Sequence, residues 1–450
     1  MEASVSIHTS IFSPEYKREP FWWEAFKPCE SDDLPVDKHI DVAVIGGGYA
    51  GTCCALTLAN AGARPVVFEA GALGQGASTR SGGQVSGGVN VQKKALASGV
   101  EDEQQREARL VARLRDAAAS MTYIEHLIDD YKINCGWHKT GRMTAMWIPA
   151  HYEAWKSRLA PLNEHTQAGA RMLPPEALAG EIGSSIYHGA ALIERGGHLH
   201  PALLYAGMLE AARGAGARFL SHAGVKSIER SSGGYLLKTS KGDFRAEKVV
   251  IATNGYTSSL TPDLKRQVLP IASHMIATEE LAPDLARSIL PTNRAVSESR
   301  RVVNHYRLSP DGKRLIFGGR ARFTPASEDK TARLLYRAML KRFPQLEGVR
   351  ITHSWGGKVA MTFDSMPHIG GADGLYYALG CNGSGVAMMS YLGHSVARKI
   401  LAQSTQPINA FDNTVMPRHP LYFGSTWFLF AVGSWYQFLD AQEKRQASPR

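Results

Sequence analysis

Apolar positions recur along this chain with two different periods, and each period predicts a different kind of element. Two nearly uninterrupted apolar runs, Asp41–Ile45 and Arg64–Phe68, are typical of strands buried on both faces of a parallel sheet. Helical spacing predicts helices over Asp102–Tyr131 and Pro201–Arg213, and a third helix that opens at Gly385. Buried strands that alternate with helices indicate an α/β unit.

A second pattern, the alternation of apolar and polar residues, begins near Val268 and ends near Pro344. The segments 270–278, 302–307 and 314–319 show it and suggest strands of an antiparallel sheet. A buried strand at 248–252 precedes this region, and the helix at Gly385 follows it. The antiparallel sheet therefore interrupts the α/β unit along the chain.

The chain length supports two domains, because a single core seldom exceeds about 250–300 residues and this chain has 450. We expect residues 38–100, 196–265 and 350–405 to form one discontinuous α/β domain. Residues 101–195 and 266–349 are expected to form a second domain on the antiparallel sheet. An N-terminal arm, 1–37, and a C-terminal tail, 406–450, remain.

A glycine-rich turn joins the first strand to its helix. Gly46, Gly48 and Gly51 follow Ile45, and Glu69 ends the next strand. In a dinucleotide-binding βαβ unit such glycines allow a tight turn, the approach of a pyrophosphate and close packing of the helix. A carboxylate at the position of Glu69 accepts hydrogen bonds from a ribose. The turn predicts a dinucleotide site, and the charge of Glu69 disfavours NADP.

The loop after Glu69 separates FAD from NAD. Residues 70–85 are rich in glycine and small hydroxyl side chains, with Arg80 among them. Such a loop has many free N–H groups, which suit a pyrophosphate, and little bulk, so a flat ring system can approach the backbone. The alternative interpretation of this segment, without a function, is a flexible surface linker.

A third glycine-rich segment lies near the other end of the chain. Trp355–Gly370 precedes a short strand, and Gly383, Ser384 and Gly385 then open the late helix. A helix N-terminus carries partial positive charge. This one is expected to stabilise negative charge on a reduced flavin ring.

Together these motifs and Phe317–Arg320 resemble the D-amino-acid-oxidase-like family of FAD oxidoreductases, and within it the gamma-glutamylputrescine oxidase-like branch. The resemblance implies a Rossmann-like FAD-binding domain interleaved with an antiparallel-sheet substrate domain, in a mixed α/β (α+β) fold. It implies FAD contacts from Gly46, Gly48, Tyr49, Ala50, Gly51, Glu69, Ala70, Gly76, Ala77, Ser78, Arg80, Ser81, Gly82, Gly83, Gln84, Val85, Val225, Thr253, Asn254, Gly255, Gly383, Gly385 and Val386.

The implied reaction is oxidation of a C–N bond in an amine or amino acid by hydride transfer to flavin N5, which gives an imine that hydrolyses. Secondary amines, N-methyl or cyclic imino acids and gamma-glutamyl amines are the candidate substrates. Catalytic roles are expected for Gly383, Ser384, Gly385 and Lys358. Tyr306 and Trp355 are candidate walls of the substrate chamber, and Arg307, Arg320 and Lys358 are candidate partners of a carboxylate.

Each of these candidates has a structural alternative. Tyr306 alternates on a strand and is equally well explained as core, while Arg307 then points to the opposite face. Arg320 follows two glycines and suits a loop cap. Lys358 suits a surface salt bridge.

Departures from the family pattern bear on flavin attachment and on the electron acceptor. Gln84–Val85 and Val359–Met361 stand where relatives place a His or Cys that links the flavin, so FAD is expected to be noncovalent. No lysine occurs in Leu315–Gly318 or Val386–Met388, where sarcosine-oxidase-like members of the family carry lysines for the reaction with oxygen. Oxygen and quinone both stay open as acceptors. A nicotinamide dehydrogenase lacks support because no second glycine motif follows a strand, and a non-enzymatic flavin-binding membrane protein is a further alternative.

Composition is that of a globular protein, with 44% hydrophobic and 20% charged residues. The five cysteines show no ligand spacing, so no metal site is expected, and they suit reduced thiols. The net charge of +10 comes from scattered Lys and Arg, which argues against nucleic-acid binding. No apolar leader precedes Asp41, so a cytoplasmic protein is expected.

The tail contains an uncharged aromatic run, 421–439, of about the length that spans a bilayer. Its Gly, Ser, Thr and Gln residues and the nearby Pro417 and Pro420 weaken a spanning helix. Three interpretations stay open: a segment packed on the protein, an interfacial anchor at the inner face of a membrane, and a true span.

Overall fold

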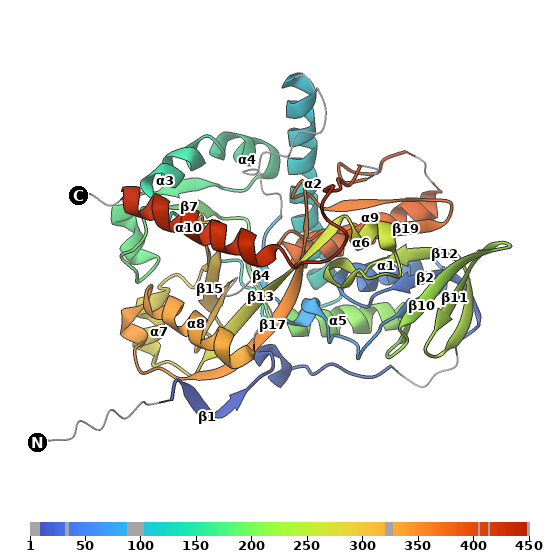
Figure 1. Cartoon of the computed structure of the whole chain (residues 1–450), viewed down its shortest axis with the longest axis horizontal. Helices are drawn as coiled ribbons and strands as arrows, with labels where there is room; N and C mark the ends of the chain where they lie inside the picture. Colours follow the sequence, from blue (N-terminus) through green and yellow to red (C-terminus); the bar gives the residue numbers. More distant parts are fainter. Residues whose placement is uncertain are drawn as a thin grey trace, which may run out of the picture.

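The computed structural model describes residues 10–31, 36–87, 103–319, 327–403, 406–412 and 415–447. Figure 1 shows two sheet-based bodies side by side, with the tail helix lying across the front of one of them. Helices pack on sheets that combine parallel and antiparallel strand pairs, which confirms the predicted mixed α/β fold.

The first body is built on a mixed sheet whose central strand pairs are parallel. Its sheet has the order β10-β11-β12-β2-β3-β9, and β19 lies parallel to β12 and pairs with β18. The strands are β2 (His39–Ile45), β3 (Pro65–Phe68), β9 (Arg218–Leu220), β10 (Val225–Ser231), β11 (Gly234–Thr239), β12 (Gly242–Ile251), β18 (His368–Ala372) and β19 (Leu375–Leu379). The predicted βαβ unit and the buried strand at 248–252 are present.

Three helices pack together in the main core of this body: α1 (Tyr49–Asn60), α5 (Pro201–Gly214) and α9 (Gly385–Ala402). Their approach is close, because a Cβ on Gly393 of α9 would lie 2.1 Å from the carbonyl oxygen of Ala50. Only a glycine at this position lets α9 lie on α1, and that contact fixes where the N-terminus of α9 points.

The second body is a nine-stranded sheet of order β1-β17-β13-β16-β15-β14-β5-β7-β6. Its strands are β1 (Phe12–Lys17), β5 (Arg142–Ala145), β6 (Arg171–Leu173), β7 (Ala190–Ile193), β13 (Val268–Thr278), β14 (Ala295–Glu298), β15 (Asn304–Leu308), β16 (Leu315–Gly319) and β17 (Ile351–Thr362). The β1–β17 and β14–β5 pairs are parallel and the others antiparallel. Because β17 pairs with β13, residues 351–362 belong with this sheet, and the domain boundary expected at 350 moves past them.

One face of the nine-stranded sheet is covered by apolar side chains of its own domain, including those of α7 (Pro283–Ile289) and α8 (Glu328–Leu340). The other face, which we call the inner face, lies against the first body. The remaining helices are α2 (Glu103–Asp130), α3 (Pro149–Lys156), α4 (Leu159–Thr166), α6 (Pro262–Lys265) and α10 (Leu429–Ala447).

The tail does not form one continuous helix over its uncharged run, because α10 begins only at Leu429. None of the helices in the described part of the chain is long and apolar enough to cross a membrane. Leu429, Gly433 and Asp440 of α10 are buried, so one side of this helix packs on the body.

Candidate functional site

The carboxyl ends of the parallel strands meet at one edge of their sheet. Gly46 follows β2, Glu69 follows β3, Thr253 follows β12 and Gly380 follows β19. Asn254 ties two of these ends together, because its Oδ1 accepts a hydrogen bond from the Gly380 N–H at 3.0 Å. Such an edge is where open α/β sheets bind nucleotides.

The glycines of the first turn divide into two kinds. A Cβ on Gly51 would lie 1.9 Å from the carbonyl oxygen of Gly46, and Gly46 itself has a φ of +105°. These two glycines are needed by the fold. A Cβ on Gly48 would meet only the Ser78 hydroxyl, at 3.0 Å, and one on Gly383 would meet nothing within 4 Å. The room beside Gly48 and Gly383 fits a cofactor that approaches the backbone.

Glu69 stands where a ribose is expected. Its carboxylate accepts hydrogen bonds from the N–H groups of Gly47, at 2.8 Å, and Gly71, at 3.1 Å. The chain before Val225 lies beside it, since a Cβ on Gly224 would lie 3.7 Å from that of Ala70. Ala70 and Val225 are thus brought to the end of the site that Glu69 marks.

Ser78 caps the first turn of α1. Its hydroxyl accepts a hydrogen bond from the Tyr49 N–H at 3.0 Å, so the loop that carries Gly76 and Ala77 reaches the helix N-terminus. Unpaired N–H groups at a helix N-terminus attract phosphates. The two predicted pyrophosphate elements, the glycine turn and the second loop, are therefore adjacent.

Four successive carbonyl groups of the second loop are each held by a hydrogen bond. The Arg80 oxygen accepts from Trp355 Nε1 at 2.8 Å and the Ser81 oxygen from Trp22 Nε1 at 2.9 Å. The Gly82 oxygen accepts from Arg307 Nε at 2.7 Å, and the Gly83 oxygen from the Leu199 N–H at 2.8 Å. We call this arrangement the loop clamp. It fixes residues 80–83 between the two bodies.

Arg307 is the charged member of the loop clamp. It is 1% exposed, and among the described residues it has no carboxylate partner. Its remaining N–H groups reach His198 Nδ1 and the carbonyls of Leu308 and Leu199, and its guanidinium lies 4.8 Å from the Trp22 ring centroid. Burial lowers the pKa of Arg307 to about 9.

The expectations that Arg307 pairs with a substrate carboxylate and that Trp355 walls the chamber are therefore corrected. Trp355 is 1% exposed, and both side chains use their donors to hold the loop. Because their donors are used in these hydrogen bonds, Arg307 and Trp355 support the loop and do not bind substrate.

The expectation that Tyr306 contacts substrate is also corrected. Tyr306 points away from the inner face of β15, stacks on Phe317 and donates to the hydroxyl of Tyr187 at 2.9 Å. It belongs to the core of the second body. Since side chains alternate along a strand, its neighbours His305 and Arg307 face inward instead.

Sequence reasoning missed the residues that face the loop. A Cβ on Gly82 would lie 3.3 Å from His305 Cε1 and 3.4 Å from Met275 Cε. Gln84 accepts from Ser297 Oγ at 3.1 Å and donates to the Val296 carbonyl at 3.2 Å, which lays β4 (Gln84–Val85) along the inner face. The signal was available: His305 is adjacent to Tyr306 in the alternating pattern.

Arg142 was also missed. It lies on β5, and its Nη1 donates to Ser86 Oγ at 2.9 Å. Its Nε is buried and has no hydrogen-bond partner within the described part of the chain. Burial lowers the pKa of Arg142, and no described carboxylate offsets that effect. A buried guanidinium with spare donors suits an anionic group.

The other candidates lie at the edges of this region. Lys358 is exposed, and its Nζ is 5.1 Å from the ring centroid of Tyr256, beside the turn that contains Thr253, Asn254 and Gly255. Ser384 precedes the first residue of α9, Gly385, and Val386 is buried in the core. Arg320 lies outside the described residues.

Comparisons with known proteins agree with this geometry. A family model described as FAD dependent oxidoreductase matches residues 41–399. Gamma-glutamylputrescine oxidoreductase of Escherichia coli is 33% identical over 89% of this chain and 92% of its own length. Probable oxidoreductase OrdL of Rhizobium meliloti is 32% identical over 96% of this chain and 99% of its own.

Solved structures give the same fold. Glycine oxidase from Geobacillus kaustophilus superposes with a TM-score of 0.68 at 21% identity, covering 85% of this chain and 99% of its own. L-proline dehydrogenase from P. horikoshii gives 0.66 at 21% identity, with 90% and 99% covered. The chain belongs to the family of FAD-dependent oxidoreductases. The predictions of an enzyme and of FAD are confirmed, and the alternatives of a nicotinamide dehydrogenase and a non-enzymatic flavin-binding protein are set aside.

A first prediction concerns the room beside Gly48. Gly48→Val should fold but purify without flavin, because its side chain would fill that space. Gly180→Val, at an exposed glycine with open space around it, is the matched control and should stay yellow. Glu69→Ala should weaken FAD binding by about 1–3 kcal/mol through loss of charge-assisted hydrogen bonds. The flavin-to-protein ratio measures the outcome, and a fully flavinated Gly48→Val would refute this placement.

A second prediction concerns the loop clamp. Trp355→Phe replaces the indole by a smaller phenyl ring and leaves the part-buried Arg80 carbonyl without its donor, which should lower the free energy of unfolding by about 1–3 kcal/mol. Trp427→Phe, at a tail position that is 81% exposed, should change nothing. Equal denaturation midpoints for the wild type and Trp355→Phe would contradict the clamp.

A third prediction follows from the histidine beside Arg307. Burial, with a smaller effect of Arg307, lowers the pKa of His198 to about 3. The unfolded chain takes up a proton at His198 below about pH 6.5, whereas the folded chain does not until about pH 3, so stability is lost as the pH falls through this window. The slope should reach about 1.4 kcal/mol per pH unit from His198.

Denaturant titrations at several pH values measure this slope. His198→Gln should reduce the slope between pH 6.5 and 4, while His39→Gln, at an exposed histidine, should leave it unchanged. An unchanged slope in His198→Gln would show that His198 is not held neutral by its site.

Proposed function

We propose that this protein oxidises a C–N bond in an amine or amino acid and that its FAD is held noncovalently. The observation that carries the proposal is the loop clamp. It holds Gly82 against the inner face of the second sheet. Gly82 belongs to the loop that resembles the flavin-contacting loop of the family. The names of the relatives, gamma-glutamylputrescine oxidoreductase and glycine oxidase, support an amine substrate.

When bound, FAD would supply the two-electron oxidant for a C–N bond of the substrate, and water would hydrolyse the imine product. The role of the chain is to keep the amine neutral and to hold the substrate in the one orientation that allows the reaction. His305, Met275 and Ser297 line the inner face beside Gly82 and Gln84 and are the residues placed to do this.

The N-terminus of α9 is the candidate for electrostatic stabilisation. Gly383, Ser384 and Gly385 lie at the same sheet edge as the glycine turn, and α9 is 18 residues long. Its first N–H groups carry partial positive charge, which stabilises an anion placed next to them. Gly383 and Gly385 leave this end free of side-chain bulk.

Arg142 and Lys358 are the candidate partners of an acidic group on the substrate. Arg142 has spare donors on the inner side, and Lys358 is exposed beside Tyr256. A carboxylate on the substrate, as in an N-methyl amino acid, a cyclic imino acid or a gamma-glutamyl amine, would meet one of these cations.

The acceptor is proposed to be oxygen or, as the second candidate, a quinone. Residues 315–318 and 386–388, where sarcosine-oxidase-like members of the family carry lysines, are buried and apolar here, which favours the quinone. Stopped-flow reoxidation of the reduced protein by oxygen and by a soluble quinone separates the two.

A fourth prediction tests the reaction class. Anaerobic mixing with secondary amines, N-methyl amino acids, cyclic imino acids and gamma-glutamyl amines should bleach the flavin with one of these classes. Gly385→Val should slow that bleaching by about tenfold while FAD content stays normal, because the helix N-terminus is screened. Arg142→Gln should raise the KM for a carboxylate substrate more than it lowers kcat. The control Gly180→Val should behave as wild type.

Two results would contradict the proposal. One is a fully flavinated protein that no amine reduces. The other is flavin that stays with the acid-precipitated protein, which would refute noncovalent attachment.

A further inference from the structure

The tail helix α10 is two-sided, and only one side is used by the fold. Figure 1 shows α10 lying across the front of the second body. The buried positions, Leu429, Gly433 and Asp440, fall on one side of the helix. Of the positions between them, Val432 and Leu439 are half-buried, and the others, 430, 431 and 434–438, are exposed.

The inner side of α10 is anchored by specific contacts. Leu429 packs on Ile271 and Met361 of the second sheet. The buried Asp440 carboxylate accepts hydrogen bonds from the N–H groups of Arg301 and Val302 at 3.1 and 3.0 Å. The orientation of α10 is therefore fixed, and the same residues always face outward.

The outer side of α10 is aromatic and uncharged over most of its length. We call this surface the outer face. Its large members, with their exposed fractions, are Phe430 (60%), Trp435 (56%) and Phe438 (56%), together with Leu421 (77%), Phe423 (70%) and Trp427 (81%) of the preceding segment. Soluble monomers seldom expose so many large apolar side chains in one place. The outer face therefore needs an occupant.

We propose that the outer face of α10 docks on an anionic lipid surface. The proposal goes beyond the C–N oxidation and does not depend on it. Tryptophan and phenylalanine on one side of a helix are the side chains that enter the headgroup region of a bilayer. Because no described helix is long and apolar enough to cross the membrane, α10 would lie flat on it.

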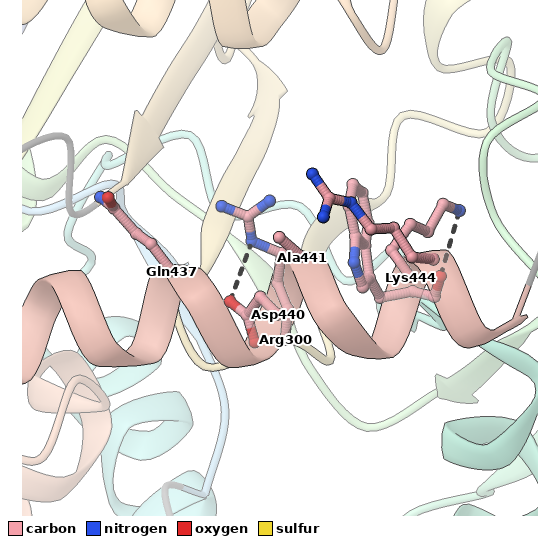
Figure 2. A pocket seen from close by; sticks show the side chains of 7 residues that line it. Arg300, Gln437, Asp440, Ala441 and Lys444 are labelled. Carbon is pink, nitrogen blue, oxygen red and sulfur yellow. Dashed lines mark hydrogen bonds and ion pairs between the residues drawn. The ribbon is translucent and has the colours of Figure 1, made fainter.

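The charges around the outer face favour an anionic partner. Asp440 and Glu443, the acidic residues of α10, point inward and bind Arg301. At the end of the helix, Arg300 is mostly buried and pairs with Glu298 and Asp440, at 3.5 and 3.7 Å, and Lys444 Nζ donates inward to the carbonyls of Trp147 and Ile186. The exposed cation at this end is Arg445. Figure 2 shows the ion pair between Arg300 and Asp440 of α10 as a dashed line, and Lys444 on the same helix.

The other end of the outer face is also basic, since the guanidinium of the exposed Arg266 lies 5.9 Å from the ring centroid of Phe423. An aromatic surface with cations at both ends matches anionic headgroups. The same cations, and a net charge of +10, oppose the alternative occupant, a second copy of this chain.

A fifth prediction tests the docking by sedimentation of the full-length holoenzyme with vesicles at low salt. Binding to vesicles that contain phosphatidylglycerol should exceed binding to pure phosphatidylcholine vesicles by about tenfold and should fall as salt is added. The combined variant Phe430→Ser, Trp435→Ser and Phe438→Ser should lose at least about tenfold of this binding. Arg445→Gln should weaken it less.

Matched controls separate docking from general loss of apolar surface. Leu334→Ser with Leu401→Ser removes side chains that are 39% and 41% exposed on other helices and should leave vesicle binding unchanged. Lys341→Gln, at an exposed lysine of another helix end, is the control for Arg445→Gln. Flavin content and reduction by an amine should be normal in all these variants, so a failure of docking is distinguishable from a failure of the proposed chemistry.

Three outcomes would overturn the docking proposal. The protein could bind phosphatidylglycerol vesicles no better than phosphatidylcholine vesicles. The combined variant could bind as well as the wild type. Light scattering could show a dimer that the combined variant converts to a monomer without any vesicle binding, in which case the outer face is an interface between two copies.

Discussion

The loop clamp is the constraint on which the site depends. Residues 80–83 run between the parallel sheet and the inner face of the nine-stranded sheet, and four consecutive carbonyls are fixed by donors that come from distant parts of the chain. A loop of small residues would otherwise be free to move. Because the donors come from the arm, from β17, from β15 and from the segment before α5, the loop cannot be placed until both bodies are assembled.

The charge of Arg307 adds a free-energy cost to the loop clamp, which only a defined set of hydrogen bonds offsets. Burying a guanidinium without a carboxylate is unfavourable, and its lowered pKa reports that penalty. Hydrogen bonds to three carbonyls and to His198, with the face of Trp22 below, offset the cost. A neutral residue at 307 would avoid the penalty but release the loop.

The local elements could be predicted from the sequence. Which side of each element faces the other body could not. The glycine turn, Glu69 and the late helix could be predicted because tight turns, acid-tipped strands and helical spacing are local. The alternation in β15 showed that Tyr306 and Arg307 point to opposite faces, but which face lies inward depends on the pairing with β14 and β16 and on the packing of the other body. Trp22 and Trp355 lie far from the loop in sequence, so their donors could not be assigned. The three interpretations of the tail were not exclusive either, because α10 packs with one side and exposes the other.

The measurement that tests the central claim most directly is amide hydrogen exchange of the protein with its flavin removed and then restored. FAD should slow exchange at 46–51, at 76–85 and at the N-terminus of α9, while α10 stays unchanged. These segments meet at one edge only if the loop clamp assembles the site as described. Protection by FAD elsewhere in the chain, with none in the clamped loop, would contradict the account.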